Sequence, residues 1–352
     1  MIELIEGKWI EAFARTFSLC GVAPGDVCAI LSETQSRPVL VKLSELALQR
    51  LDARPFHVTM VTPAVNAPVP VRSTGSSKAL QGLSQPIAAL AASKFVIDCS
   101  VEGLLHANER AQVLAQGASL MMISNEHPEV LERLIPDPRL AAAVDIGVGL
   151  LRNAKEMRVT SKAGTDLTIR IDGAPVRGSC GFVTPESRIA YWPAGLCLCF
   201  PKVGSVNGVL VLAPGDANLT FKSYIQNPVR FRIVDDFIED IDGEGLDVEL
   251  TCSYLGAWRD RNAYAVSHVG WGLNPRARWD AMVGYDRADI NGTELRAFAG
   301  NFLYSTGANE HAGRFTEGHF DFPMRNCTIA LDGKTVVSDG EVQWDLFGGF
   351  PF

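Results

Sequence analysis

The sequence reads VCAIL at residues 27–31, VLVKLSELALQRL at 39–51 and FHVTMV at 56–61, and this stretch decides the fold of the first half. The first run is continuously apolar, as in a strand that is buried on both faces. The second run spaces its apolar side chains as an amphipathic helix does, within a predicted helix over 37–51. Strand, helix and strand in this order predict a right-handed βαβ unit with parallel strands.

The same alternation continues toward residue 154. We predict helices over 86–92, 108–116 and 138–154, and strands over 95–99 and 119–123. The first half is therefore expected to be an α/β domain with a mostly parallel sheet. A G-x-G-x-x-G fingerprint is absent from the sequence, so a dinucleotide cofactor is not expected.

Beyond residue 155 the pattern changes to short strand-like runs separated by Gly, Pro, Asp and Asn. This predicts a mainly antiparallel β (α+β) domain that carries the metal site, with domains at 1–155 and 156–352. The acidic segment 237–249 lacks the spacing of a calcium-binding EF-hand loop, and we expect a solvated hairpin there. The predicted strands of this half cover 157–160, 166–171, 196–200, 208–212 and 230–233.

Composition restricts the class of protein. A net charge of −8 over 352 residues, with no basic run, argues against a nucleic-acid partner. No apolar stretch is long enough for a membrane span, and the acidic N-terminal residues do not form a signal peptide. We expect a cytoplasmic protein, which at this size is often a homo-oligomer. The eight cysteines are expected to be reduced, with Cys197 and Cys199 in a core strand.

The sharpest local feature is the H-x-D unit of His319 and Asp321, which alternates with Phe320 and Phe322. Residues i and i+2 of a strand point to one face, so the imidazole and the carboxylate project together with the rings packed behind them. With a nitrogen from His268, they would form the 2-His-1-carboxylate face of non-haem Fe(II) oxygenases. A polar strand face without metal remains the alternative at this point.

Two further features concern the histidines. Gly270 and Gly272, which follow His268, permit close backbone approach. His106 follows the strand predicted at 95–99, and ligands of α/β sheets gather beyond the carboxyl ends of strands. His106 is therefore a candidate acid, base or substrate donor, with a surface histidine as the alternative. We expect structural roles for His57 and His127, and a solvated position for His311.

Several segments resemble the 2,5-dihydroxypyridine 5,6-dioxygenase family of bacterial nicotinic-acid degradation. The resemblance covers nearly the whole chain and is most specific in the second half. The segments that carry it are LLH at 104–106, SKAGTD at 161–166, WPAG at 192–195, SHVGWGLNPRARW at 267–279, RAF at 296–298, GNFL at 300–303, STG at 305–307 and HFDFPMRNC at 319–327.

The resemblance implies one Fe(II) per chain, held by His268, His319 and Asp321. The partners would be a small hydroxylated pyridine and O2. The ring would open between carbons 5 and 6 with both oxygen atoms entering N-formylmaleamic acid, and no NADH would be needed. Manganese would suit the same ligands.

The resemblance also suggests roles for four further residues. His106 would be the catalytic acid–base residue, since an imidazole exchanges protons near neutral pH. Leu105 would line the substrate pocket. Ser305 would line the site or support a ligand, and Arg296 would pair with a substrate oxygen or with a carboxylate.

The wider superfamily is similar to the two-metal leucyl aminopeptidases of the aminopeptidase T type. Where that pattern has two glutamates and a histidine, this chain has Leu196, His268 and Arg296. Losing carboxylates removes the charge that would hold two dications close together, which favours one-metal oxygen chemistry. The alternatives are a metal-dependent aminopeptidase or amide hydrolase, a ring-cleaving dioxygenase for another N-heterocycle, and a binding protein that has lost catalysis.

Overall fold

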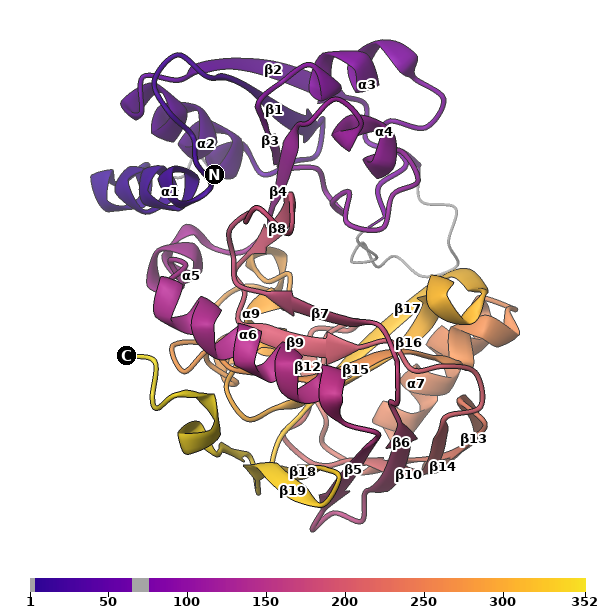
Figure 1. The fold of residues 1–352 in the computed structure, drawn as a ribbon. Coiled ribbons are helices and arrows are strands. Elements are labelled where there is room, and N and C mark those ends of the chain that lie inside the picture. The colour runs from indigo at the N-terminus through magenta and orange to yellow at the C-terminus, as the bar shows by residue number, and fades with distance from the viewer. Residues whose placement is uncertain (1–3, 65–75) are drawn as a thin grey trace.

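The structure is a computed structural model and describes residues 4–64 and 76–352. An N-terminal α/β part packs against a larger β-rich part (Figure 1). None of the helices in these two ranges combines the length and apolarity that crossing a membrane requires.

The first sheet is parallel throughout, in the order β2-β1-β3-β4-β8. This confirms the parallel sheet predicted from the alternation of helices and strands. Its fifth strand, β8, lies beyond residue 155, and the proposed division at that residue stays a prediction. The strands are β1 (Val27–Glu33), β2 (Arg54–Met60), β3 (Phe95–Asp98), β4 (Ser119–Ile123) and β8 (Ile189–Trp192).

Both faces of this sheet are covered, which explains the continuous apolar run in β1. Cys28 and Ile30 join a core with residues of helices α1 (Gly7–Leu19) and α2 (Pro38–Arg50). Ala29 and Leu31 point to the other face and join a second core with residues of α3 (Ser84–Ala91) and α4 (Arg110–Leu114). Alternate side chains of one strand thus serve two hydrophobic cores.

The β-rich part contains two antiparallel sheets that share one hydrophobic core. Phe231 of one sheet packs against Phe322 of the other with ring centroids 5.4 Å apart. The eight-stranded sheet has the order β14 (Phe237–Gly243), β13 (Val229–Val234), β10 (Val206–Leu212), β6 (Asp166–Arg170), β5 (Glu156–Ser161), β18 (Cys327–Leu331), β19 (Lys334–Ser338) and β20 (Glu341–Val342). The five-stranded sheet has the order β17 (Arg314–Met324), β16 (Phe302–Asn309), β15 (Val266–Gly272), β9 (Leu196–Cys199) and β7 (Val176–Ser179).

Short elements connect and border these sheets. Strands β11 and β12 form a small separate ladder, and α6 packs beside β7 and β9. The remaining elements are α5 (Pro128–Arg133), α6 (Pro138–Asn153), β11 (Ala217–Asn218), β12 (Ser223–Tyr224), α7 (Leu246–Ala257), η1 (Arg261–Tyr264), α8 (Ala281–Gly284), η2 (Arg287–Asp289), α9 (Thr293–Ala297), η3 (Glu310–Ala312) and η4 (Trp344–Phe347).

The hairpin expected over the acidic segment 237–249 is wrong in its second half. Strand β14 ends at Gly243, and helix α7 begins at Leu246 after Gly245, whose φ is +84°. Asp247 and Glu249 fall in the first turn of this helix, where the helix dipole favours negative charge. Asp247 is also buried and accepts hydrogen bonds from two backbone N–H groups, so it is structural.

Candidate metal and active site

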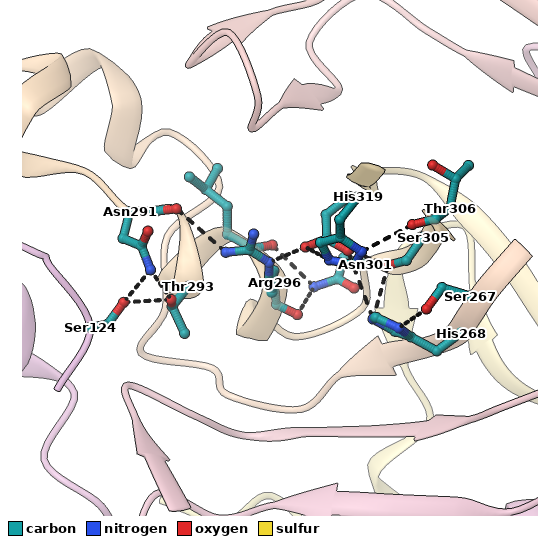
Figure 2. Close-up of polar contacts among 12 residues, drawn as sticks. Ser124, Ser267, His268, Asn291, Thr293, Arg296, Asn301, Ser305, Thr306 and His319 are labelled. Carbon is teal, nitrogen blue, oxygen red and sulfur yellow. Dashed lines mark hydrogen bonds and ion pairs between the residues drawn. The ribbon is translucent and has the colours of Figure 1, made fainter. Parts of the chain in front are cut away.

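Three neighbouring strands bring the candidate side chains to one face of the five-stranded sheet. In the register of β16 and β17, Ser305 lies opposite Asp321, and His268 reaches the same cluster from β15 (Figure 2). Phe320 and Phe322 point to the other face and are fully buried in the core. The period-two pattern of the sequence predicted this split, and the structure confirms it.

Hydrogen bonds fix that Nδ1 carries a proton in each imidazole. The backbone oxygen of Thr306 can only accept, so His319 donates to it from Nδ1 over 3.0 Å. Ser267 donates its hydroxyl proton to the oxygen of Ala308 and therefore accepts from Nδ1 of His268 at 3.1 Å. With Nδ1 protonated in both rings, Nε2 is the nitrogen that can face a metal, the arrangement that metal-binding histidines use. In the structure, Nε2 of His268 lies 2.9 Å from the Ser305 hydroxyl.

The two Nε2 atoms face one carboxylate. His319 Nε2 lies 3.2 Å from Oδ2 of Asp321, and His268 Nε2 lies 3.8 Å from Oδ1. Two donors bound at right angles to one metal, each at about 2.1 Å, lie about 3 Å apart. Lone pairs that face each other at such distances repel unless a cation or a proton lies between them.

In the structure, these donors do not form a complete metal site. Within residues 4–64 and 76–352, no group of three or more His, Cys, Asp or Glu side chains meets the geometry of a metal site. The chemistry of the donor set nevertheless fits a divalent metal, because two neutral imidazoles and one carboxylate suit Fe(II). The 3.8 Å between His268 Nε2 and Asp321 Oδ1 is longer than the spacing of two bound donors, so this pair stands wider than a bound metal would hold it.

The charges of the cluster agree with this reading. Burial lowers the pKa of His268 to about 3, which keeps the ring neutral. Burial alone would raise the pKa of Asp321, but the neighbouring His319 and Arg296 outweigh it and hold that pKa well below its usual range. Arg296 Nε donates to Asp321 Oδ2 at 2.6 Å, and the Ser305 hydroxyl donates to Oδ1. Asp321 is thus an ionised acceptor.

His106 approaches this cluster from the other part of the molecule. Its loop follows β3 and is shaped by Asp98, whose carboxylate accepts from the backbone N–H groups of Ser100 and Leu104. The ring centroid of His106 lies 6.4 Å from that of His319. The side chain keeps exposed surface but has protein on most sides, so its loss of bulk water lowers its pKa to about 4. Leu105 is half-buried beside it.

The glycines near His268 behave as expected. A Cβ on Gly270 would lie 2.0 Å from the oxygen of Cys197, and one on Gly272 would lie 2.2 Å from the oxygen of Phe298. Only glycine allows β15 to approach the neighbouring backbones this closely. Cys197 is fully buried, as the sequence predicted.

Some contacts were not foreseen. Phe200 lies between two histidines, with its ring centroid 5.7 Å from His268 and 5.2 Å from His311. His311 is exposed, as expected, although one side of its ring packs against Phe200. Tyr254 donates its hydroxyl to the backbone oxygen of His319. These residues are distant in sequence, and only the tertiary structure brings them to the site.

Two other histidines lie where they were expected, and a structural role is confirmed for His127. His57 lies within β2. His127 caps α5, where its Nδ1 accepts from the backbone N–H of Glu129 at 3.2 Å.

Comparisons with known proteins agree on one family. Residues 8–344 match the family model NicX, described as 2,5-dihydroxypyridine 5,6-dioxygenase. A 2,5-dihydroxypyridine 5,6-dioxygenase from Pseudomonas putida is 36% identical over 341 residues, covering 94% of this chain and 95% of the relative. The solved structure of the 2,5-dihydroxypyridine dioxygenase from P. putida KT2440 superposes with a TM-score of 0.88 at 34% identity, covering 97% and 98% of the two chains.

A more distant structure shares the fold alone. AmpT from Thermus thermophilus has a TM-score of 0.61 at 12% identity and covers 96% of this chain and 99% of its own. This likeness supports the expected fold class. It carries no statement about chemistry.

Proposed function

The chain belongs to the 2,5-dihydroxypyridine 5,6-dioxygenase family and is an oxygenase, and on this premise we propose that it opens the ring of 2,5-dihydroxypyridine between carbons 5 and 6. The observation that carries the proposal is the convergence of His268, His319 and Asp321 on one sheet face, with His106 reaching them from the other part. Both atoms of O2 would enter N-formylmaleamic acid. Substrate and O2 combine without loss of atoms, so no external reductant is required.

Two imidazole nitrogens and the Asp321 carboxylate would hold the cofactor, which we propose to be one Fe(II) per chain. The proposal is supported by the two Nε2 atoms that face the ionised carboxylate of Asp321. Bound Fe(II) would supply a place where O2 and the substrate hydroxyl group meet and exchange electrons.

His106 would take up the proton of a ring hydroxyl. With a pKa lowered to about 4, its imidazole is neutral at physiological pH and keeps a nitrogen lone pair that can accept a hydrogen bond from the ring hydroxyl. Its position beside His319 places it near the ligands without making it one of them. The half-buried Leu105 would line the pocket on the same loop, and Ser305 would support Asp321 by donating its hydroxyl proton to the carboxylate.

Further parts of the proposal concern the protein in the cell. We propose a cytoplasmic homo-oligomer that acts in nicotinate degradation, with domains at 1–155 and 156–352. Light scattering of the purified protein would give the number of subunits. Limited proteolysis would test the domain boundary, since cuts between domains concentrate in exposed linkers.

The deciding experiment is oxygen uptake by anaerobically purified, Fe(II)-loaded protein after addition of 2,5-dihydroxypyridine, with ultraviolet absorbance followed in parallel. We expect one O2 consumed per ring lost. A matched control is 2-hydroxypyridine, which lacks the second hydroxyl and should cause no uptake.

Absence of uptake with iron bound would contradict the proposed substrate. A panel of other dihydroxylated N-heterocycles would then test the related dioxygenase activity. A peptide and amide panel run without oxygen would test the hydrolase alternative, which the buried Leu196 at a carboxylate position of the aminopeptidase pattern disfavours.

A further inference from the structure

Arg296 contacts a candidate metal ligand directly. It lies on α9, and its Nε donates to Oδ2 of Asp321 at 2.6 Å (Figure 2). The two side chains are 15% and 3% exposed. A guanidinium stays charged at any pH that the protein tolerates, so this is a permanent, shielded ion pair at the centre of the site.

The backbone around Arg296 is fixed from two sides. Asn301 Nδ2 donates to the oxygen of Arg296 at 2.9 Å, and Asn301 Oδ1 accepts from the N–H of Gly272 at the end of β15. The guanidinium also donates from Nη1 to the oxygen of Asn291 at 3.4 Å. Arg296 is thus tied to the strand that carries His268.

The other side is the N-terminal part of the molecule. Glu126 accepts from the N–H groups of Asn291 and Thr293, at 3.0 Å and 2.8 Å. Ser124 bonds to the Thr293 hydroxyl at 2.6 Å. These contacts connect the end of β4 to α9 and hold the backbone before Arg296 in place (Figure 2).

Both oxygens of Asp321 consequently have a donor of their own, Ser305 for Oδ1 and Arg296 for Oδ2. A carboxylate whose two oxygens both accept hydrogen bonds cannot rotate freely. It therefore presents its lone pairs to a metal in a fixed direction. We propose that Arg296 is a positioning residue that fixes the Asp321 carboxylate for metal binding, and that it does not bind substrate. This inference rests on the proposed function only in that Asp321 serves as a metal ligand.

Two effects of Arg296 on metal affinity oppose each other. Its positive charge repels a dication, whereas its hydrogen bond orients the ligand. We expect orientation to dominate, because removing a partner of a metal ligand typically costs about 10–100-fold in metal affinity or activity. The affinity of Arg296→Gln for metal should therefore fall, although the variant has lost a repelling charge.

The experiment is an anaerobic titration of the metal-free protein with Co(II), read by its visible absorption, and with Fe(II). We expect Arg296→Gln to bind both metals about 10–100-fold more weakly than wild type. Its KM for 2,5-dihydroxypyridine at saturating metal should not change. Arg296→Lys keeps the charge but loses the planar fork, and its affinity should fall less far.

Arg133→Gln is the matched control. Arg133, on α5, donates to both carboxylate oxygens of Glu294, at 2.5 Å and 3.1 Å. Glu294 lies on α9, like Arg296, but is not one of the candidate ligands. The loss of Arg133 should leave metal affinity at the wild-type value. An equal loss in Arg133→Gln would overturn the inference, because loosening of α9 would then explain both results.

Other outcomes also decide. Wild-type or increased metal affinity in Arg296→Gln would overturn the inference, as would a raised KM with unchanged metal affinity. If circular dichroism shows that Arg296→Gln does not fold, the metal affinity of Arg296→Lys is the deciding measurement. A wild-type affinity of Arg296→Lys would then overturn the inference. Because the titration needs no substrate, a wild-type protein that binds no metal would instead refute the proposed cofactor.

Discussion

The imidazole of His106 lies 6.4 Å from that of His319, measured between ring centroids, although the two residues belong to different parts of the chain. His106 follows a strand of the parallel sheet, and His319 lies within β17 of an antiparallel one. The candidate ligands and the candidate acid–base residue are thus supplied by different parts of the chain. Their roles can be separated by mutation.

Replacing His268 by alanine should abolish metal retention, because one of the two nitrogen donors is lost. The metal content of the purified variant after loading and desalting measures this. His311→Ala is a suitable control, since His311 also contacts Phe200 but lies outside the ligand set. Normal metal content in His268→Ala would remove His268 from the proposed ligands.

His106→Phe should keep the metal and slow turnover by about 10²–10⁴-fold, the usual contribution of a general acid or base. The ring shape is retained and the proton acceptor is lost. Rate and metal content should be measured on the same sample. If turnover is unchanged, His106 is only a surface histidine, the alternative that the sequence left open.

Gly270→Ala should destabilise the protein by about 1–3 kcal/mol or more, the range for overpacked interiors. The added Cβ would meet the Cys197 oxygen at 2.0 Å and push β15, with His268, away from β9. Urea denaturation measures the change. Gly284→Ala is the control, because a Cβ there has no atom within 4 Å. Equal stability of the two variants would contradict the close packing.

Glu126 should give the protein a measurable pH dependence of stability. Burial raises its pKa to about 7, whereas an ordinary glutamate titrates near 4.5. Between these values the folded state holds a proton that the unfolded state has released, so this contribution falls as pH rises. The loss should reach about 3 kcal/mol by pH 8, at 1.36 kcal/mol for each unit of the pKa difference.

The measurement is urea denaturation of wild type and Glu126→Gln at pH 5 and pH 8. The variant cannot ionise there, so its stability relative to wild type should increase from the lower to the higher pH. Glu129→Gln, at an exposed position on α5, should show no such difference. A constant difference between wild type and Glu126→Gln would contradict the raised pKa.

Local sequence patterns predicted much of the fold. The apolar run in β1 and the helix after it required a covered parallel strand, and the Phe320 and Phe322 alternation fixed which face of β17 carries His319 and Asp321. Such patterns succeed because side-chain direction along a strand or helix follows directly from residue spacing. The hairpin predicted for the acidic segment near Asp247 was wrong in its second half, because polar residues at a helix start resemble those of a solvated hairpin.

The sequence by itself determined the strand and helix order, the pairing of an imidazole with a carboxylate on β17, and the family. Only the tertiary structure decided that Arg296 binds Asp321, that Phe200 lies beside His268, and that His106 meets His319. The physical reason is distance along the chain. Spacing governs side chains a few residues apart, whereas contacts between separate sheets depend on strand register and on how the two parts pack.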